Sequence, residues 1–219
     1  MQDLEYIELE TAPGPTATVI WLHGLGASGH DFEPVVPELG LPEDAAVRFI
    51  FPHAPNMPVT INGGMTMPAW YDIKAMDIDR IVDTDQLMSS AGSVGKLVDR
   101  EIERGVPAEK IIIAGFSQGG AVAYELGLSY PKRLAGVLAL STYFATAKTI
   151  QVSEANAEIP ISIYHGSFDP VVPESLGVRS VETLKAMGFS PTYQTFPMEH
   201  SVCLEEVLDI GRFIRKHVL

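Results

Sequence analysis

The feature that most constrains this chain is a repeated alternation between short apolar runs and longer amphipathic stretches. The runs "ATVIWLH", "VRFIF", "KIIIAGF", "GVLAL" and "ISIYH" are largely apolar, which is typical of strands buried on both faces. Helical patterns are expected at residues 79–104, 119–130, 173–187 and 204–218. Strands that alternate with helices in this way predict an α/β fold, a mostly parallel sheet with helices on both faces.

Two further segments are predicted to be strands near the edges of the sheet. "LEYIEL" at residues 4–9 alternates with period two, and "TYQTF" at residues 192–196 is short and polar. The chain has 219 residues, of which 46% are hydrophobic, and it shows no repeat or linker. We therefore predict a single domain spanning residues 1–219.

Charge and hydropathy exclude several classes of partner. The net charge of −13 would repel phosphate backbones and disfavours nucleic acid. No apolar run reaches the ~18 residues of a membrane-spanning helix, and "MQDLEYIELE" lacks the basic and apolar regions of a signal peptide. We therefore expect a cytoplasmic protein without an integral membrane segment. The only cysteine, Cys203, is interpreted as a small buried hydrophobe.

One long segment, residues 52–73, does not fit the alternation. It is rich in proline, contains Gly63-Gly64 and shows no regular periodicity. Long irregular loops in compact domains are usually functional or disordered, and this one is too apolar for a solvated linker. We expect an ordered loop over a pocket, with Met65 and Trp70 as candidate substrate-binding residues; simple packing on the core is the alternative.

Two glycine motifs compete for a functional role. "GLGASG" at residues 24–29 matches a dinucleotide-binding fingerprint, but the region where its acidic partner should lie, residues 47–55, contains no Asp or Glu. We therefore predict no nucleotide cofactor. The overlapping "HGLG" matches instead the turn that supplies a backbone N–H to the oxyanion hole of α/β-hydrolases.

The second motif, "GFSQG" at residues 115–119, follows a buried strand and precedes a helix. This is the strand–turn–helix context of a nucleophile elbow. Gly115 and Gly119 would remove side chains that collide within the tight turn. Ser117 would then lie at a helix N-terminus, where backbone donors favour developing negative charge. Ser117 is therefore the candidate nucleophile.

The partners of Ser117 follow by elimination. On this fold the acid and then the histidine come after the serine. Asp169 is the only aspartate between Ser117 and His200, and His217 is the only later histidine. His217 falls in the last turn of an expected helix, where it would offset the helix dipole, so His200 is the candidate base. The chain contains no ligand spacing typical of a metal site.

Glutamates remain rival acids and are interpreted as solvated surface charges. They are Glu125, Glu154, Glu158, Glu174, Glu182 and Glu199.

Several ordered motifs together resemble the acyl-protein thioesterase and bacterial carboxylesterase family, also called phospholipase/carboxylesterase, which is the small cap-less branch of the α/β-hydrolases. They are "LHGLGASGHDF", "FPHAPNMPVTINGGMTMPAWYDI", "GFSQGGA", "HGSFDPVVP" and "MEHSVC". The resemblance runs from about residue 18 to residue 217, with "PAWYD" in place of the usual "PSWFD". It implies Ser117, Asp169 and His200 as a catalytic triad, and the backbone N–H groups of Leu25 and Gln118 as the oxyanion hole. It further implies an acyl-binding groove beside residues 52–73, and a homodimer.

Three functions are compatible with these residues. The first is a serine carboxylesterase that hydrolyses small to medium acyl esters through an acyl-enzyme. The second is an acyl-protein thioesterase or lysophospholipase that removes long acyl chains. The third is a non-catalytic binding module with a vestigial site.

Overall fold

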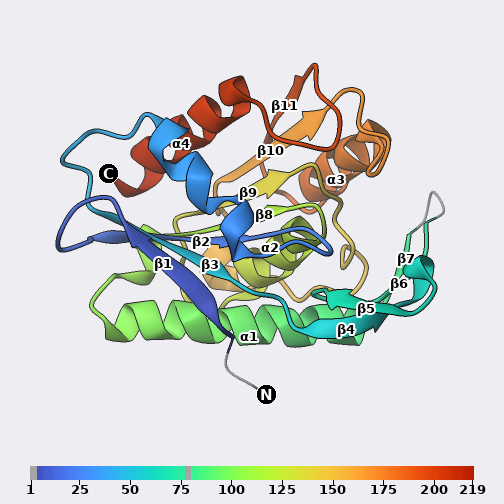
Figure 1. Cartoon of the computed structure of the whole chain (residues 1–219). Helices are drawn as coiled ribbons and strands as arrows, with labels where there is room; N and C mark the ends of the chain where they lie inside the picture. The colour runs from blue at the N-terminus through green and yellow to red at the C-terminus, as the bar shows by residue number, and fades with distance from the viewer. Residues whose placement is uncertain (1–3, 77–79) are drawn as a thin grey trace.

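The protein, described here by a computed structural model over residues 4–76 and 80–219, is built around a seven-stranded sheet (Figure 1). The strand order is β1-β3-β2-β8-β9-β10-β11. Only β1 is antiparallel to its neighbour, and all other pairs are parallel. The strands are β1 (Tyr6–Glu10), β2 (Ala17–Leu22), β3 (Val47–Pro52), β8 (Ile111–Phe116), β9 (Gly136–Leu140), β10 (Ile161–Gly166) and β11 (Thr192–Phe196).

Helices cover both faces of this sheet, as the alternation predicted. In β2, Ile20 and Leu22 pack in one core cluster with residues of α1 (Thr84–Glu103), α2 (Gln118–Ser129) and α3 (Glu174–Ala186). Val19 and Trp21 point the other way, into a cluster with α4 (Leu204–Val218) and the 3₁₀-helix η2 (Glu33–Leu39). Figure 1 shows α1 and α2 on one side of the sheet and α4 with η2 on the other. Both faces of β2 are therefore buried.

The predicted strands are confirmed, including the two at the sheet edges. Within residues 4–76 and 80–219, β1 pairs only with β3, and β11 pairs only with β10. The helices at 119–130, 173–187 and 204–218 agree with α2, α3 and α4 to within one residue at each end. Among the described residues, no helix is both long enough and apolar enough to cross a membrane.

The predicted start of the longest helix was wrong. α1 begins at Thr84, where the Asp83 side chain accepts a hydrogen bond from the N–H of Gln86 and caps the helix. Ile81 belongs to a short strand, β7 (Ile81–Val82), paired with β6 (Ile73–Ala75), and the predicted start at Asp79 lies outside the described residues. Ile81 and Met88, whose spacing fits the apolar face of the helix expected at 79–104, are 55% and 48% exposed. Gly105, with φ +96°, follows the end of the helix.

The segment at 52–73 is not an irregular loop but contains a β-hairpin. β4 (Asn56–Val59) pairs antiparallel with β5 (Met65–Pro68), joined through the 3₁₀-helix η3 (Thr60–Asn62). Gly63 and Gly64 adopt φ values of +66° and +77° in the turn, a conformation that favours glycine. "NGG" between two apolar segments is a recognised hairpin signal, which the proline content obscured.

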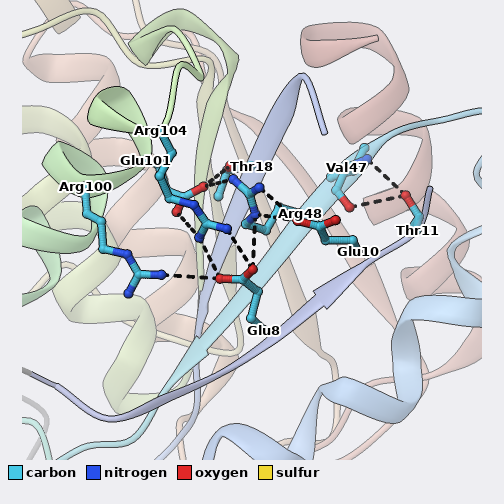
Figure 2. A network of polar contacts seen from close by, with 9 residues as sticks. All are labelled: Glu8, Glu10, Thr11, Thr18, Val47, Arg48, Arg100, Glu101 and Arg104. Atoms are coloured by element: carbon cyan, nitrogen blue, oxygen red, sulfur yellow. Dashed lines mark hydrogen bonds and ion pairs between the residues drawn. The ribbon is translucent and has the colours of Figure 1, made fainter. Parts of the chain in front are cut away.

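A network of charges with the buried Glu101 and Arg48 at its centre fastens the C-terminal turn of α1 to the sheet (Figure 2). Glu101 is fully buried and accepts hydrogen bonds from Thr18 at 2.9 Å, Arg48 at 2.7 Å and Arg104 at 2.9 Å. Arg48 lies on β3 and also contacts Glu10 and Glu8 on β1. This network was not predicted from the sequence, because its members come from β1, β2, β3 and the end of α1, which are far apart along the chain.

Candidate active site

Ser117 lies at a sharp turn between β8 and α2, as the elbow motif predicted. It has φ +54°, which a non-glycine residue rarely adopts. A Cβ on Gly115 would lie 2.3 Å from the Gly119 carbonyl oxygen, and a Cβ on Gly119 would lie 2.5 Å from the His23 carbonyl oxygen. Both glycines are therefore required for the close approach of the chain at this turn, which confirms the reason we gave for them.

Ser117, His200 and Asp169 form a continuous chain of hydrogen bonds. The Ser117 Oγ lies 2.9 Å from His200 Nε2, and His200 Nδ1 lies 2.6 Å from Asp169 Oδ2. Asp169 follows β10, and His200 lies in the loop between β11 and α4. The three residues proposed by elimination thus meet beyond the carboxyl ends of the parallel strands, where sites on open α/β sheets form.

Asp169 is held as an anion by the groups around it. Burial alone would raise its pKa. Hydrogen bonds from His200 and from the N–H groups of Val171 and Val172, each 2.8 Å from Oδ1, outweigh that effect and lower the pKa. A carboxylate at Oδ2 can accept the Nδ1 proton of His200, which leaves Nε2 as an acceptor facing the Ser117 hydroxyl.

Ser117 and His200 open onto a cavity of about 380 Å³. Its wall is apolar over much of its area, with Arg80, Asp31 and Tyr143 among the polar members. The apolar residues include Leu25, Ile61, Ile73, Met76, Phe116 and Val171. A hydroxyl activated by a histidine at the end of an apolar cavity can attack the carbonyl carbon of a bound acyl group.

Leu25 and Gln118, the two residues that the resemblance implied as oxyanion donors, both line this cavity. Gln118 is the first residue of α2, so its N–H has no acceptor within the helix. By contrast, the N–H groups of Gly120 and Ala121 already have an acceptor, because both donate to the Ser117 carbonyl. The two candidate donors therefore come from separate parts of the chain, the turn after β2 and the start of α2.

Met65 and Trp70 are not brought to the cavity at Ser117. Met65 lies on β5 with 62% of its surface exposed. Trp70 is fully buried and borders a second cavity of about 660 Å³, together with Met57 and Pro68. The segment 52–73 does reach the first cavity, but through Ile61, Asn62 and Ile73. Substrate contact by Met65 or Trp70 therefore gains no support from the cavity at Ser117.

The other histidines make structural contacts. His53 accepts a hydrogen bond from the N–H of Gly29, and His30 contacts Glu33 on the surface. His165 is fully buried with Nε2 2.8 Å from the Val172 carbonyl and 3.8 Å from Asp169. Burial lowers the pKa of His217, so its predicted role as a positive charge at the end of α4 is reduced. Its ring packs against Phe213 instead.

Two groups that hold the backbone near these residues were not predicted from the sequence. The Thr142 hydroxyl donates to the Ser117 carbonyl at 2.5 Å, and His165 holds the loop that carries Asp169. No spacing in the sequence marks either residue, because Thr142 and Ser117 are 25 positions apart. Only the neighbouring register of β8 and β9 brings them together.

The chain is similar over nearly its whole length to proteins of one known family. The profile of the phospholipase/carboxylesterase family matches residues 6–218. Acyl-protein thioesterase 1 of Neurospora crassa is 41% identical over 214 residues, which cover 93% of this chain and 87% of that protein. Acyl-protein thioesterase 1 of Gibberella zeae is 38% identical, with 93% and 91% covered.

The solved structures give the same picture at the level of the fold. The crystal structure of acyl-protein thioesterase 2 from Zea mays superposes with a TM-score of 0.86 at 29% sequence identity. The match covers 98% of this chain and 99% of the maize chain.

Proposed function

The chain belongs to the phospholipase/carboxylesterase family, and from this premise we propose that it is an acyl-protein thioesterase that releases acyl chains through an acyl-enzyme on Ser117. Family membership confirms the predicted α/β-hydrolase fold without a large cap, and the predicted class of serine hydrolase acting on ester or thioester bonds. The relatives' names favour the thioesterase interpretation over our first one, a carboxylesterase for small to medium acyl esters. Both use the same chemistry.

The observation that carries the proposal is the hydrogen-bonded chain from Asp169 through His200 to Ser117 at the end of an apolar cavity. In the first step, His200 Nε2 removes the Ser117 proton as Oγ attacks the carbonyl carbon. Asp169 orients the imidazole and stabilises its charged form. The N–H groups of Leu25 and Gln118 stabilise the oxyanion, each contributing about 3 kcal/mol to lowering the barrier.

The second half of the reaction regenerates the enzyme. His200 gives its proton to the departing sulfur or oxygen as the carbon–sulfur or carbon–oxygen bond breaks, which leaves an ester on Ser117. His200 then removes a proton from water, whose oxygen attacks the same carbonyl carbon. The carboxylic acid leaves as the proton returns to Ser117. Water is the only co-reactant, and no cofactor or metal enters the proposal.

The test compares acetyl, octanoyl and palmitoyl thioesters with the matching oxygen esters. We expect kcat/KM to rise with chain length on the thioesters, because each buried CH₂ contributes up to ~0.8 kcal/mol. A flat or falling series would instead favour the small-ester carboxylesterase.

Ser117→Ala should abolish turnover while the far-ultraviolet circular dichroism stays unchanged. If Ser117 resists a fluorophosphonate probe and Ser117→Ala matches the wild type, the site is vestigial and the proposal fails.

A further inference from the structure

The side chain of Gln118 is committed to one neighbouring segment of backbone. Its Oε1 accepts a hydrogen bond from the Trp70 N–H at 2.8 Å, and its Nε2 donates to the Tyr71 carbonyl at 2.6 Å. Gln118 is 1% exposed, so both bonds are shielded from water. The two hydrogen bonds of the carboxamide thus join residues 70–71 to Gln118, the residue that follows Ser117.

The same segment also holds the turn that carries Leu25. The Trp70 indole Nε1 donates to the His23 carbonyl at 2.9 Å, and the Gly26 N–H donates to the Pro68 carbonyl at 2.8 Å. The Ser90 hydroxyl on α1 donates to the Trp70 carbonyl, which anchors the segment from behind. Residues 68–71 therefore bond on one side to the turn at residues 23–26 and on the other to Gln118.

His23 makes this turn rigid in a defined tautomer. Its Nε2 accepts from the Ala54 N–H at 3.0 Å, so the proton lies on Nδ1, which donates to the Gly24 carbonyl at 2.7 Å. Burial lowers the pKa of His23, which keeps the ring neutral, as these two bonds require. The turn that presents the Leu25 N–H is thus fixed within itself and against residues 68–71.

We propose that residues 68–71 act as a strut that sets the separation between the N–H groups of Leu25 and Gln118, with the Gln118 carboxamide and the Trp70 indole as positioning residues. The proposal rests on the proposed function, in which these two groups hold the oxyanion. Two donors on separate elements act together only if both lie within about 2.7–3.1 Å of the developing charge. Trp70 acts through the backbone and not by touching the acyl chain.

The decisive variants each release one end of the strut. Gln118→Met keeps the length of the side chain without its two hydrogen bonds, and Trp70→Phe keeps an aromatic ring without the indole N–H. We expect each to lower kcat on an octanoyl thioester by about 10- to 100-fold while KM changes less than about twofold. Gln118→Met combined with Trp70→Phe should cost little more than the worse single variant, because both release the same strut.

Controls separate positioning from general damage. Ser129→Ala removes a side-chain hydrogen bond to the Glu125 carbonyl at the far end of the same helix, and should lower the melting temperature without changing kcat. If Gln118→Met does not fold, Trp70→Phe carries the test alone, because it releases the other end of the strut.

Wild-type kcat in folded Gln118→Met or Trp70→Phe overturns the strut, as does a loss confined to KM. That result is distinguishable from failure of the proposed function. If the strut alone is wrong, wild-type turnover still depends on Ser117. If the wild-type protein shows no Ser117-dependent turnover, the proposed function fails, and the strut proposal fails too because it depends on that function.

Discussion

At the scale of the residue, Ser117 is held in an unfavourable conformation by its neighbours. Its φ of +54° carries a strain of about 1–3 kcal/mol for a residue with a Cβ. The Ser117 N–H donates to the Leu140 carbonyl at 2.9 Å, and the Thr142 hydroxyl donates to the Ser117 carbonyl. These bonds fix the backbone on both sides of Cα, so that Oγ is presented to His200.

Asp169→Asn tests whether the carboxylate sets the tautomer of His200. An amide NH₂ facing Nδ1 would move the ring proton to Nε2, which then cannot accept the proton of Ser117. We expect kcat to fall by about 10³- to 10⁴-fold with the fold intact, measured on an octanoyl thioester. Asp44→Asn, an exposed loop change, should retain full activity. An Asp169→Asn protein within tenfold of the wild type would contradict the assigned role.

Gly119→Ala tests the close contact between α2 and the turn at residues 23–26. The new Cβ would lie 2.5 Å from the His23 carbonyl and 2.6 Å from the Leu22 carbonyl, both of them backbone atoms. We expect destabilisation by about 1–3 kcal/mol together with a loss of kcat, measured by urea denaturation and thioester hydrolysis.

Gly92→Ala is the matched control on α1, because its Cβ meets no atom within 4 Å. It should stabilise the protein by up to about 1 kcal/mol through helix propensity. Equal stability changes in the two glycine variants would show that the contact at Gly119 is not tight.

At the scale of the element, α1 is tied to the sheet by charge as well as by its apolar face. Its buried side includes Leu87, Val94 and Val98, while Glu101 faces Arg48 on β3 and Arg104 one turn away (Figure 2). Arg104 in turn contacts Glu8 on β1, and the Arg104 hydrogen bond is the largest effect that lowers the pKa of Glu8. The network thus links α1, the longest helix, to the edge strand β1 and to its neighbours β3 and β2.

Glu101→Ala should be among the most destabilising changes outside the core. It removes the carboxylate that pairs with Arg48, whose side chain is 9% exposed, and breaking a buried pair costs about 3–5 kcal/mol. Glu103→Ala, an exposed change two positions along the same helix, should cost less than about 0.5 kcal/mol. Urea denaturation compares the two, and kcat per folded molecule should be unchanged in both. A loss under 1 kcal/mol in Glu101→Ala would mean that the remaining charges compensate.

At the scale of the whole molecule, stability depends on pH through a carboxyl that folding buries. Glu206 in the first turn of α4 is fully buried, and neither oxygen makes a well-formed hydrogen bond within the described part of the chain. Burial raises the pKa of Glu206 to about 8. The folded protein therefore keeps the proton after the unfolded chain, with an ordinary pKa near 4.5, has released it.

The sign of the effect follows from linkage. Below pH 4.5 both states hold the proton, and between 4.5 and 8 only the folded state does, so stability falls as pH rises through this window. We measure the free energy of unfolding in urea from pH 4 to pH 8. The value for Glu206→Gln should rise relative to that of the wild type by up to roughly 1.4 kcal/mol per pH unit. Exposed Glu205→Gln should show no such gain, and parallel curves for Glu206→Gln and the wild type would refute the assignment.

The predicted homodimer and cytoplasmic location also belong to this scale, and both stay predictions. Equilibrium sedimentation of the full chain would test the dimer directly.

The order of elements and the three candidate catalytic positions could be predicted because the signals for them are local. Apolar runs such as "KIIIAGF" and the motif around Ser117 each lie within a few consecutive residues. The predicted start of α1 was too early and the hairpin at residues 56–68 was not predicted, and both errors have equally local causes. Ile81 and Met88 fit a helical period without being buried, and proline masked the turn at Gly63 and Gly64.

The sequence by itself thus determined the sheet, the helices on its two faces, and the three positions we propose for catalysis, Ser117, Asp169 and His200, because backbone preference and chain order suffice for these. Only the tertiary structure decided which side chains hold that chemistry in place. Gln118 meets Trp70 across 48 positions and Arg48 meets Glu101 across 53. The packing of strands and helices determines which residues so far apart become partners, and short-range periodicity in the sequence does not specify that packing.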